Sequence, residues 1–381
     1  MSDQEEQKLG QDWIRNKVVA QDLCTGCGAC VNLCPYQKIH RDRTVNLHLC
    51  DRQDGRCRNY CPRSPVDLDR LRKALFDPGD IVPELGPFKG LYMSRAVDET
   101  IRSAAQHGGT VSALIKLALE EGLIDTALLS ERREDHLPLN HTADNAESVL
   151  SGAGSSFVVS PTLANFNAAS KGSAQKIGVV ATPCQALALA KMRVNTWPED
   201  KERIKKLSLV IGLFCGWALD WKKLKALVAE ECGGEKIRGM DIPPSGHACM
   251  ELYTDDHTIQ VPIEKVNQCV RQACNYCFDM TCEFSDIAVG SARSPDGWNV
   301  DRGWNQVIVR SDLGQSLLDL AQQKGMLEFK AVPPANLEKL MAASARKKQA
   351  CLGNLTDRTG TEKDLIYLDC EDAAVCRIHE V

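Results

Sequence analysis

The cysteines near the start of the chain have the spacing of an iron–sulfur motif. They follow the pattern C-x2-C-x2-C-x3-C-P at Cys24, Cys27, Cys30, Cys34 and Pro35. In such a run three closely spaced thiolates bind one [4Fe–4S] cluster, and the fourth cysteine binds a second cluster. Gly26 and Gly28 leave room for the backbone to approach the sulfides, because glycine has no side chain. A zinc site is the alternative, but zinc usually takes its cysteines as two separated C-x2-C pairs.

Three further cysteines repeat part of this pattern as Cys50-x6-Cys57-x3-Cys61, again followed by proline. In two-cluster ferredoxins the last cysteine of each run binds the other cluster. The crossover would give one cluster Cys24, Cys27, Cys30 and Cys61, and the other Cys34, Cys50 and Cys57. The second set is one thiolate short. It suits a [3Fe–4S] cluster, or a cube whose fourth iron takes Asp51, Asp54, water or another cysteine. Alternatively, Cys50 and Cys57 are only buried thiols.

Two apolar runs farther along the chain are each followed by a cysteine. Residues 176–181 and 207–214 are short and almost wholly apolar, which is typical of buried parallel strands. Open α/β sheets bind their ligands at the carboxyl ends of such strands. The predicted ligands of a third [4Fe–4S] site are Cys184, Cys215, Cys274 and Cys277, with Cys269 and Cys282 as alternates. A zinc site or a redox-active thiol pair is the competing interpretation.

Two loops of small residues have the composition of an anion-binding turn. Gly108 and Gly109 precede an amphipathic pattern over residues 111–119, and Thr110 is the expected N-cap. The free amides at a helix start can bind the phosphates of a cofactor, although a glycine pair before a helix is more often a simple turn. Residues 150–157 form a second loop of this kind. His107 is interpreted as an exposed or capping residue.

Four segments, taken in order, resemble one known family. They are residues 181–185 (ATPCQ), residues 213–215 (LFC), the pair Cys274 and Cys277, and residues 285–291 (SDIAVGS). Together with the cysteine-rich leader they make the chain similar to the beta subunits of coenzyme F420 hydrogenases and dehydrogenases. Within that family it resembles the subunits of F420-linked formate dehydrogenase and F420H2 dehydrogenase. The resemblance covers about residues 85–312, beyond the leader.

This resemblance implies a flavoprotein that exchanges a hydride between F420 and FAD and passes single electrons through its clusters. The reaction is centred on the flavin, so no catalytic side chain is predicted. The residues that the resemblance assigns to the FAD site are Gly108, Gly109, Thr110, Ala153, Gly154, Ser155, Thr182, Pro183, Gln185, Asp286, Gly290 and Ser291. The alternatives for two of them are a loop cap at Asp286 and a turn at Gly290.

One position departs from the family pattern. A lysine that is common after the small-residue loop is Ser156 here. Losing a cation beside a phosphate site would weaken or change what binds there. The flavin is therefore the firmer prediction, and the hydride partner the less firm one.

Composition limits the classes of function. The chain has 381 residues, 18 cysteines and a formal net charge of −5, a balance that calls for neither nucleic acid nor an anionic membrane as partner. The first twenty residues lack the apolar core of a signal peptide, and no run of about eighteen apolar residues could span a bilayer. Without export, metal ligation explains the cysteines better than disulfides. We expect a reducing, anaerobic cytoplasm.

The elements that must position these residues divide into two main domains. We expect an α+β ferredoxin-like two-cluster domain (1–76), a linker (77–84) and an α/β domain that binds FAD and the third cluster (85–330). A C-terminal helix and tail (331–381) would dock on another subunit. Within the second domain, residues 296–305 form a loop that could cover the flavin.

Three functions compete. The first is the F420-linked subunit of a larger redox complex, with a formate dehydrogenase, hydrogenase or heterodisulfide-reductase-like partner. The second keeps the FAD and cluster fold but uses ferredoxin or NAD(P)H; the absence of a G-x-G-x-x-G motif after a strand counts against the nicotinamide. The third is a multi-cluster adaptor without catalysis. Five cysteines receive no role: Cys232, Cys249, Cys351, Cys370 and Cys376.

Overall fold

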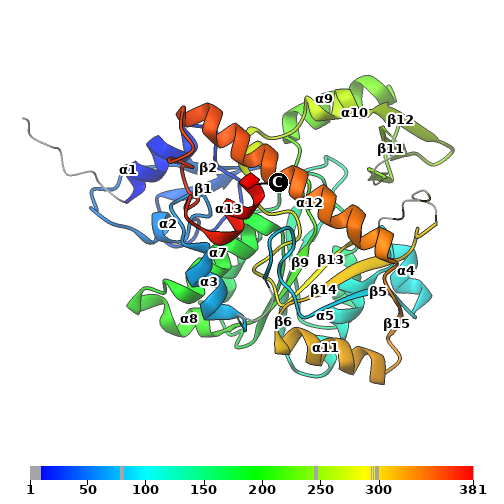
Figure 1. Cartoon of the computed structure of the whole chain (residues 1–381). Coiled ribbons are helices and arrows are strands. Elements are labelled where there is room, and N and C mark those ends of the chain that lie inside the picture. The colour runs from blue at the N-terminus through cyan, green and yellow to red at the C-terminus, as the bar shows by residue number, and fades with distance from the viewer. Residues whose placement is uncertain are drawn as a thin grey trace, which may run out of the picture.

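An eight-stranded sheet forms the centre of the computed structural model, which describes residues 10–77, 81–243, 248–292, 294, 296 and 300–380 (Figure 1). The strand order is β15-β5-β14-β13-β9-β8-β6-β7. Their bounds are β5 Gly90–Ala96, β6 Thr126–Glu131, β7 Leu139–Ala143, β8 Ile177–Ala181, β9 Leu207–Leu213, β13 Ile287–Ser291, β14 Asn305–Val309 and β15 Leu327–Lys330. The predicted linker and covering loop lie partly outside the described residues.

The four central strands, β6, β8, β9 and β13, run parallel to one another. This confirms the parallel strands predicted from the apolar runs. The outer strands are antiparallel to their neighbours, which gives a mixed sheet. The helices of this region are α4 Glu99–Ala104, α5 Thr110–Glu120, α6 Thr162–Ala169, α7 Pro183–Val194, α8 Lys201–Lys205 and α11 Asp312–Gln323.

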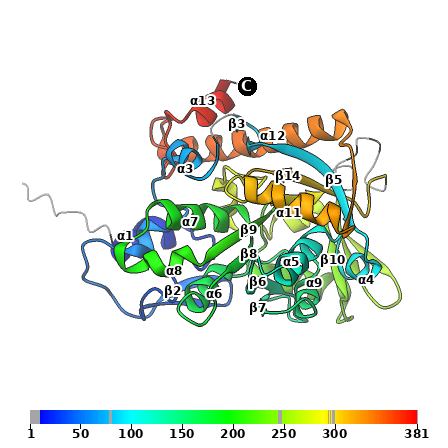
Figure 2. The ribbon, with the colours of Figure 1, turned by 90° about the horizontal axis from the view of Figure 1, so that it is seen from below.

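The two faces of the sheet bury different helices because successive strand side chains point to opposite sides. On β9, Leu209 and Ile211 face α5 and α11, whereas Val210 faces the opposite side. That opposite side packs against α6, α7 and the cysteine-rich leader. Figure 2 shows α5 and α11 apart from α7 and α8. The sheet therefore lies between two apolar layers, each with its own core.

The leader shares the core of the second region. It contains α1 Gln11–Ile14, a π-helix Arg15–Val19, β1 Gln37–His40, β2 Arg43–Asn46, α2 Arg56–Asn59 and α3 Leu68–Leu75. Its loop rests on α6, because the Leu163 amide donates to the Cys27 carbonyl (3.1 Å) and Asn167 Nδ2 donates to the Ala29 (3.0 Å) and Val31 (2.7 Å) carbonyls. The short strands β3 Ile81–Val82 and β4 Gly86–Pro87 then lead into β5.

A small sheet with its own core is inserted between β9 and β13. It consists of α9 Trp221–Cys232, β10 Gly239–Asp241, β11 Cys249–Tyr253, β12 Thr258–Pro262 and α10 Ile263–Asn267. In Figure 1 this insertion lies at the upper right of the molecule. Among the described residues, short 3-10 helices also occur at Ser148–Gly152, Pro198–Asp200 and Gln272–Tyr276.

The C-terminal segment packs along the whole molecule through α12 Pro334–Thr359 and α13 Ala373–Glu380 (Figure 1). Leu340, Leu352 and Leu355 of α12 are buried in the same core as the leader. The Val66 amide of the leader donates to the Tyr367 carbonyl (2.9 Å). Several apolar side chains of this segment are therefore buried inside this chain.

No helix in the described ranges is both long and apolar enough to cross a membrane.

Candidate iron–sulfur and flavin site

The candidate site lies at one edge of the central sheet. The four parallel strands end at this edge, and each is followed by a residue of interest: Arg132 after β6, Cys184 after β8, Cys215 after β9, and Ser291 at the end of β13. Strand β14 runs antiparallel to β13, and β5 runs antiparallel to β14, so the start of β14 (Asn305) and the end of β5 (Ser94) lie at this same edge. The topology thus collects most of the predicted residues on one side of the molecule.

The structure brings the four predicted ligands of the third cluster into one group. Burial raises the pKa of Cys184, and the neighbouring Cys277 and Cys274 raise it further. Cys215 behaves similarly: burial raises its pKa and Lys347 opposes the rise, while Cys274, Cys277 and Cys184 add to it. The Ala218 amide donates to Cys274 Sγ (3.3 Å), a contact typical of cluster thiolates. The four thiols come from three segments that are distant in sequence, as predicted.

The side chains of this group are not spaced as the ligands of a single metal ion would be. In the described part of the chain no three His, Cys, Asp or Glu side chains stand close enough to share one ion. A [4Fe–4S] cluster binds each thiolate at a different iron, so its ligands lie farther apart than those of zinc. All eighteen cysteines lie in the described part, and none forms a disulfide.

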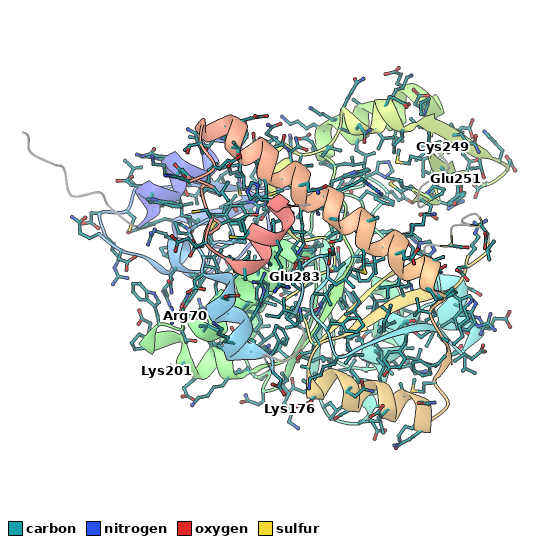
Figure 3. All side chains as sticks on the ribbon, in the orientation of Figure 1. Arg70, Lys176, Lys201, Cys249, Glu251 and Glu283 are labelled. Carbon is teal, nitrogen blue, oxygen red and sulfur yellow. The ribbon has the colours of Figure 1, made fainter. Side chains whose placement is uncertain are left out.

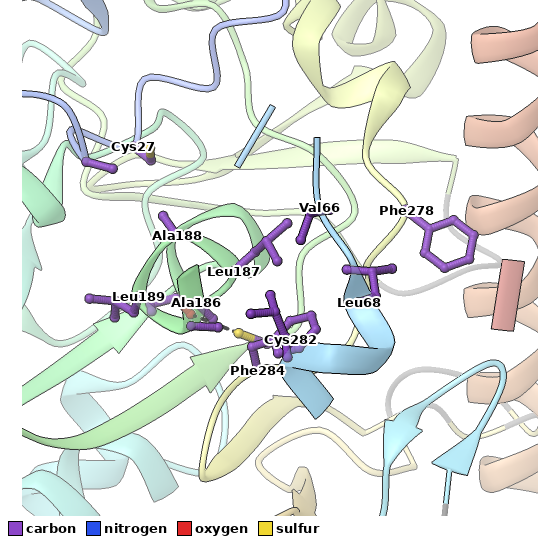
Figure 4. Close-up of a cluster of buried hydrophobic side chains, with 14 of the residues drawn as sticks. Cys27, Val66, Leu68, Ala186, Leu187, Ala188, Leu189, Phe278, Cys282 and Phe284 are labelled. Atoms are coloured by element: carbon purple, nitrogen blue, oxygen red, sulfur yellow. Dashed lines mark hydrogen bonds between the residues drawn. The ribbon is translucent and has the colours of Figure 1, made fainter. Parts of the chain in front are cut away.

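The two alternate ligands take other positions. Cys269 is buried in the core of the inserted sheet. Cys282 is buried below the sheet edge, where its Sγ contacts the Ala181 carbonyl (3.5 Å). Figure 4 shows Cys282 beside Ala186 and Phe284 within the main core. A Cβ on Gly212 would lie 2.5 Å from the Cys282 sulfur, so this thiol fills a tightly packed position.

The cysteines of the leader form two neighbouring groups that agree with the predicted crossover. Burial raises the pKa of Cys30, and Cys24, Cys27 and Cys61 raise it further. The pKa of Cys57 is raised to about 12, mainly by burial. The Arg58 amide opposes this rise, whereas the neighbouring Cys34, Cys61 and Cys50 add to it. Cys61 raises the pKa of Cys27 and Cys30 in the first group and also that of Cys57 in the second, so it lies between the groups, whereas Cys34 lies with the second.

The first leader group adjoins the third group. After burial, the largest influence that raises the pKa of Cys27 comes from Cys184, followed by Cys61. Clusters bound by these two groups would be neighbours within the protein. This proximity could not be predicted, because it depends on how the leader docks on α6.

The glycines of the leader have a structural role that differs from the predicted one. Gly28 has φ +84°, and a Cβ there would lie 2.6 Å from the Ala164 amide nitrogen. Gly26 has φ +72°, and a Cβ there would lie 2.6 Å from the Asp42 carbonyl oxygen. Both positions need glycine for a left-handed backbone and for close packing within the protein. Room for the sulfides is not required to explain them.

The first small-residue loop is fixed by an asparagine that the sequence analysis missed. The Thr110 amide donates to Asn305 Oδ1 (3.2 Å), and Asn305 Nδ2 donates to the Gly290 carbonyl (3.2 Å). Asn305 thereby connects two predicted flavin segments. Its only sequence signal is a polar amide at the start of an otherwise apolar strand.

Two predictions about this loop need correction. Gly109, with φ +76°, is the N-cap of α5, and Thr110 is its first helical residue. The Thr110 hydroxyl shares a 2.8 Å hydrogen bond with Ser94 and is fully buried. His107 is partly buried rather than exposed; burial lowers its pKa, and the neighbouring Asp241 of β10 opposes this effect.

Position 290 must be glycine because the Phe214 ring packs directly against its backbone. A Cβ at this position would lie 2.0 Å from the Phe214 ring, and the Phe214 amide donates to the Val289 carbonyl (2.9 Å). The strand end at Gly290 and Ser291 therefore packs on the segment that carries Cys215. A flavin near these residues would lie beside the third group of thiols.

The second small-residue loop borders a cleft that contains several cations. The cleft has a volume of about 240 Å³, and Ser155, Ser156 and Arg132 line it together with Lys236 and Arg238 of the insertion. A Cβ on Gly154, which has φ +87°, would lie 2.9 Å from Arg132 Cζ. Arg132 thus places a cation near Ser156, where the family pattern has a lysine.

Strand β10 connects the two predicted flavin loops. A Cβ on Gly239, at its start, would lie 3.5 Å from Arg132 Nη1, and Asp241, at its end, accepts a hydrogen bond from Gln106. Two residues of strand span only about 7 Å. The loops at 108–110 and 153–155 therefore face the same short strand.

These residues fit part of a bound FAD. The cations in the cleft suit phosphate groups, and its apolar lining includes Phe157, Ile237 and Met240. The cleft is smaller than the about 300–1,000 Å³ of sites that enclose a whole ligand of this kind. It would hold one portion of the cofactor, and the remainder would extend along the sheet edge. The flavin stays a prediction.

Among the predicted residues after β8, Gln185 uses its side-chain amide for hydrogen bonds within the fold. Gln185 is buried; its Oε1 accepts from the Thr182 amide (2.8 Å) and its Nε2 donates to the Ser160 carbonyl (2.7 Å). Together with Thr182 it forms a capping box at the start of α7, and Pro183 is the first residue of that helix. Gln185 therefore positions Cys184 and leaves no side-chain group free.

Asp286 does not lie with the other predicted flavin residues. It precedes β13, at the opposite edge of the sheet from Ser291. Its carboxylate accepts from the Val210 amide (2.8 Å) and the Ser311 hydroxyl (2.7 Å). The predicted role in the pocket is wrong for this residue, which fastens β9 and the start of α11.

Comparison with known proteins agrees with this geometry. The N-terminal model of the coenzyme F420 hydrogenase/dehydrogenase beta subunit family matches residues 91–166, and the C-terminal model matches residues 174–335. The beta subunit of coenzyme F420 hydrogenase from Methanothermobacter thermautotrophicus is 30% identical over 284 residues, covering 72% of this chain and 96% of that subunit. The chain belongs to the coenzyme F420 hydrogenase/dehydrogenase beta subunit family.

Further relatives support this family assignment. A subunit of the F(420)H(2) dehydrogenase from Methanosarcina mazei is 26% identical, covering 84% of this chain and 88% of that protein. A solved chain in the F420-reducing [NiFe] hydrogenase complex from Methanosarcina barkeri matches with a TM-score of 0.68 and 25% identity, covering 74% of this chain and 96% of the other. A 4Fe-4S binding domain model matches residues 17–37, which include the first cysteine run.

The family models leave two parts of the described site outside their limits. Cys50, Cys57 and Cys61 follow the 4Fe-4S match, and α12 begins where the C-terminal family model ends. The thiols of the third group and the two small-residue loops all lie inside the family models.

Proposed function

We propose that this chain is the F420-dependent subunit of a redox complex and carries FAD and three iron–sulfur clusters. The observation that carries the proposal is the meeting of Cys184, Cys215, Cys274 and Cys277 at the sheet edge that also holds Gly108, Gly109 and Gly290. When bound, FAD would exchange a hydride with F420 and pass the electrons singly to the clusters.

The chain's own residues would bind and orient the flavin. The start of α5 presents backbone amides and the positive end of the helix dipole, which favour a phosphate group. Arg132 would add a cation on the opposite side of β10. Phe214, packed between Gly290 and the Cys215 segment, would keep water out from between the flavin and the third cluster.

The order of the thiol groups suggests a path for electrons. The third group adjoins the sheet edge, and Cys184 of that group lies close enough to Cys27 of the leader to raise its pKa. Cys61 and Cys57 then connect the two leader groups. Electrons would thus pass between the flavin and the outer leader group, where a partner subunit docks. The named relatives are subunits of hydrogenase and dehydrogenase complexes, and we propose such a partner here.

Anaerobic purification with iron, sulfide and flavin counted per chain tests the proposal. We expect one FAD and iron for three clusters. Reduced F420 should bleach the flavin absorption rapidly, and NADH should not. Broad cluster absorption without flavin would instead support the adaptor. Flavin that responds to NADH or reduced ferredoxin, but not to reduced F420, would keep the fold and exclude F420 as the hydride partner.

A further inference from the structure

A lysine of α12 joins two of the loops that carry the third group of thiols. Lys347 Nζ donates to the Cys215 carbonyl (2.6 Å) and to the Asp279 carbonyl (2.9 Å). Cys215 is itself a candidate ligand, and Asp279 is two residues beyond Cys277. The ammonium group therefore lies between two ligand-bearing loops and holds both.

The ammonium group of Lys347 shares a hydrogen-bond partner with a candidate ligand, because Cys277 Sγ also donates to the Asp279 carbonyl (3.4 Å). Its two hydrogen-bond partners are neutral carbonyls, whereas the next residue, Lys348, pairs with the carboxylate of Glu283. Burial lowers the pKa of Lys347, but the neighbouring Cys277 and Cys215, followed by Asp279, raise it above the ordinary value. A negatively charged cluster at these thiols would be the main counter-charge for this lysine.

An arginine of the leader approaches the same group. Arg63 is 2% exposed, its Nη2 donates to the Ala273 carbonyl (3.0 Å), and its guanidinium lies 4.6 Å from the centre of the Tyr367 ring. Tyr367 in turn donates to the Tyr276 carbonyl (2.9 Å) and accepts from the Phe278 amide (3.2 Å), on both sides of Cys277. Arg63 is thus fixed beside the thiols.

Both cations lie outside the segments that match the family. Arg63 lies between the 4Fe-4S match and the N-terminal family model, and Lys347 lies beyond the C-terminal family model. The ligands of the third group come from the family core. Its positive surroundings come from the leader and from α12, which pack around that core.

We propose that Lys347 and Arg63 are positioning residues that raise the reduction potential of the third cluster. This inference rests on the proposed function, because it requires a cluster at Cys184, Cys215, Cys274 and Cys277. A cluster gains negative charge on reduction, and its potential depends on net charge, hydrogen bonds and exposure. A nearby cation attracts the more negative, reduced cluster more strongly than the oxidised cluster. Because the two cations are buried, salt screens this attraction only weakly.

The test is a redox titration of the full-length holoprotein followed by electron paramagnetic resonance. The signal of the third cluster is first assigned as the one that Cys184→Ser removes. In Lys347→Met we expect the ratio of reduced to oxidised third cluster to fall roughly tenfold at a given potential, which is a midpoint lower by about 59 mV. Arg63→Gln should lower the same midpoint, and the leader signals should shift much less.

Two controls separate charge from packing. Arg346→Gln removes a positive charge from the exposed neighbouring position on α12 and should leave the midpoint unchanged. Lys347→Arg keeps the charge and should retain most of the wild-type midpoint. An unchanged midpoint in Lys347→Met with full iron content would overturn the inference.

The iron count distinguishes the remaining outcomes. Loss of the third cluster in Lys347→Met but not in Lys347→Arg would support a requirement for the charge. Loss in both variants would show a packing role and would overturn the inference. A wild-type protein without a third cluster would instead refute the proposed function, and this result appears before any Lys347 variant is made.

Discussion

Arg132 places a cation beside the loop at 153–156, where Ser156 stands at the position of the family's common lysine. Its guanidinium lies between Gly154 and Gly239, and the cleft beside it also borders Ser155 and Ser156. A charged hydrogen bond to phosphate is worth about 1.5–3 kcal/mol, and 1.4 kcal/mol corresponds to a factor of ten in affinity. We therefore infer that Arg132 provides the interaction that a lysine at position 156 would otherwise make.

The prediction is that Arg132→Gln weakens FAD binding by about tenfold or more. Binding is measured by titrating flavin-depleted protein with FAD and following flavin fluorescence. Riboflavin, which lacks phosphates, should bind the variant and the wild type equally. Arg70→Gln on the surface of α3 removes the same charge away from the site and should have no effect (Figure 3). Equal FAD affinity in the Arg132 variant would exclude this arginine from phosphate binding.

The sequence allowed the thiols to be named but not the residues that surround them. Ligands such as Cys274 and Cys277 carry their own signal, because cluster chemistry restricts their type and spacing. Asn305, Arg132 and Lys347 are ordinary polar residues in sequence, and they become significant only when distant loops meet. Asp286 shows the opposite case, since a residue within a family motif serves the fold at the far edge of the sheet.

At the scale of elements, continuous apolar segments could be located and partly exposed ones could not. The strands at 177–181 and 207–213 follow the apolar runs closely. Strands β7 and β10–β12 are short and half exposed, so their polar residues conceal the pattern. Helix α12 extends to Thr359, although Gly353 and the polar residues after it are not typical of a helix interior. Tertiary packing stabilises this last part.

The contact between the leader loop and α6 requires glycine at position 28. Its backbone is left-handed, and an added Cβ would lie 2.6 Å from the Ala164 amide nitrogen and 2.8 Å from the Pro161 carbonyl oxygen. We predict that Gly28→Ala lowers the melting temperature of the anaerobic holoprotein and the occupancy of the first leader cluster. The left-handed backbone alone costs about 1–2 kcal/mol with a side chain present.

The control for this prediction is Gly353→Ala in α12. A Cβ at Gly353 meets nothing within 4 Å, and alanine is the better helix former, so stability should be kept or increased. Iron per chain and the melting temperature are measured for both variants. A Gly28→Ala protein with the wild-type melting temperature and full iron would show that the loop and α6 are not tightly coupled.

At the scale of the molecule, the leader, the α/β core and the C-terminal segment act as one packed body. Arg72 of α3 lies within hydrogen-bond distance of Asp372 beyond α12 (2.9 Å) and close to Glu283 of the core (3.3 Å), and all three are buried. Glu283 also pairs with Lys348, and Figure 3 labels it near the middle of the molecule. Breaking one member would leave buried charges without partners, which costs more than a surface pair contributes. This network connects the leader, the core and the segment beyond α12 through buried charges.

That arrangement makes the third group of thiols the link between the sheet edge and the leader. Cys184 is the third-group thiol that raises the pKa of Cys27, which places the two groups side by side. Electrons from the flavin should therefore reach the leader clusters through the third cluster. We predict that Cys184→Ser lowers the iron content from three clusters to two while FAD is retained. Reduced F420 should still bleach the flavin, but the leader signals should then appear far more slowly in freeze-quenched samples.

Cys249→Ser serves as the matched control, because Cys249 belongs to none of the three thiol groups and lies on β11 of the insertion, where Figure 3 labels it. It should change neither the iron content nor the rate at which the leader clusters are reduced. Unchanged iron in Cys184→Ser would remove this cysteine from the ligand set. Lost iron with undiminished reduction of the leader clusters would keep the ligand assignment and refute the path, since electrons would then reach the leader without the third cluster.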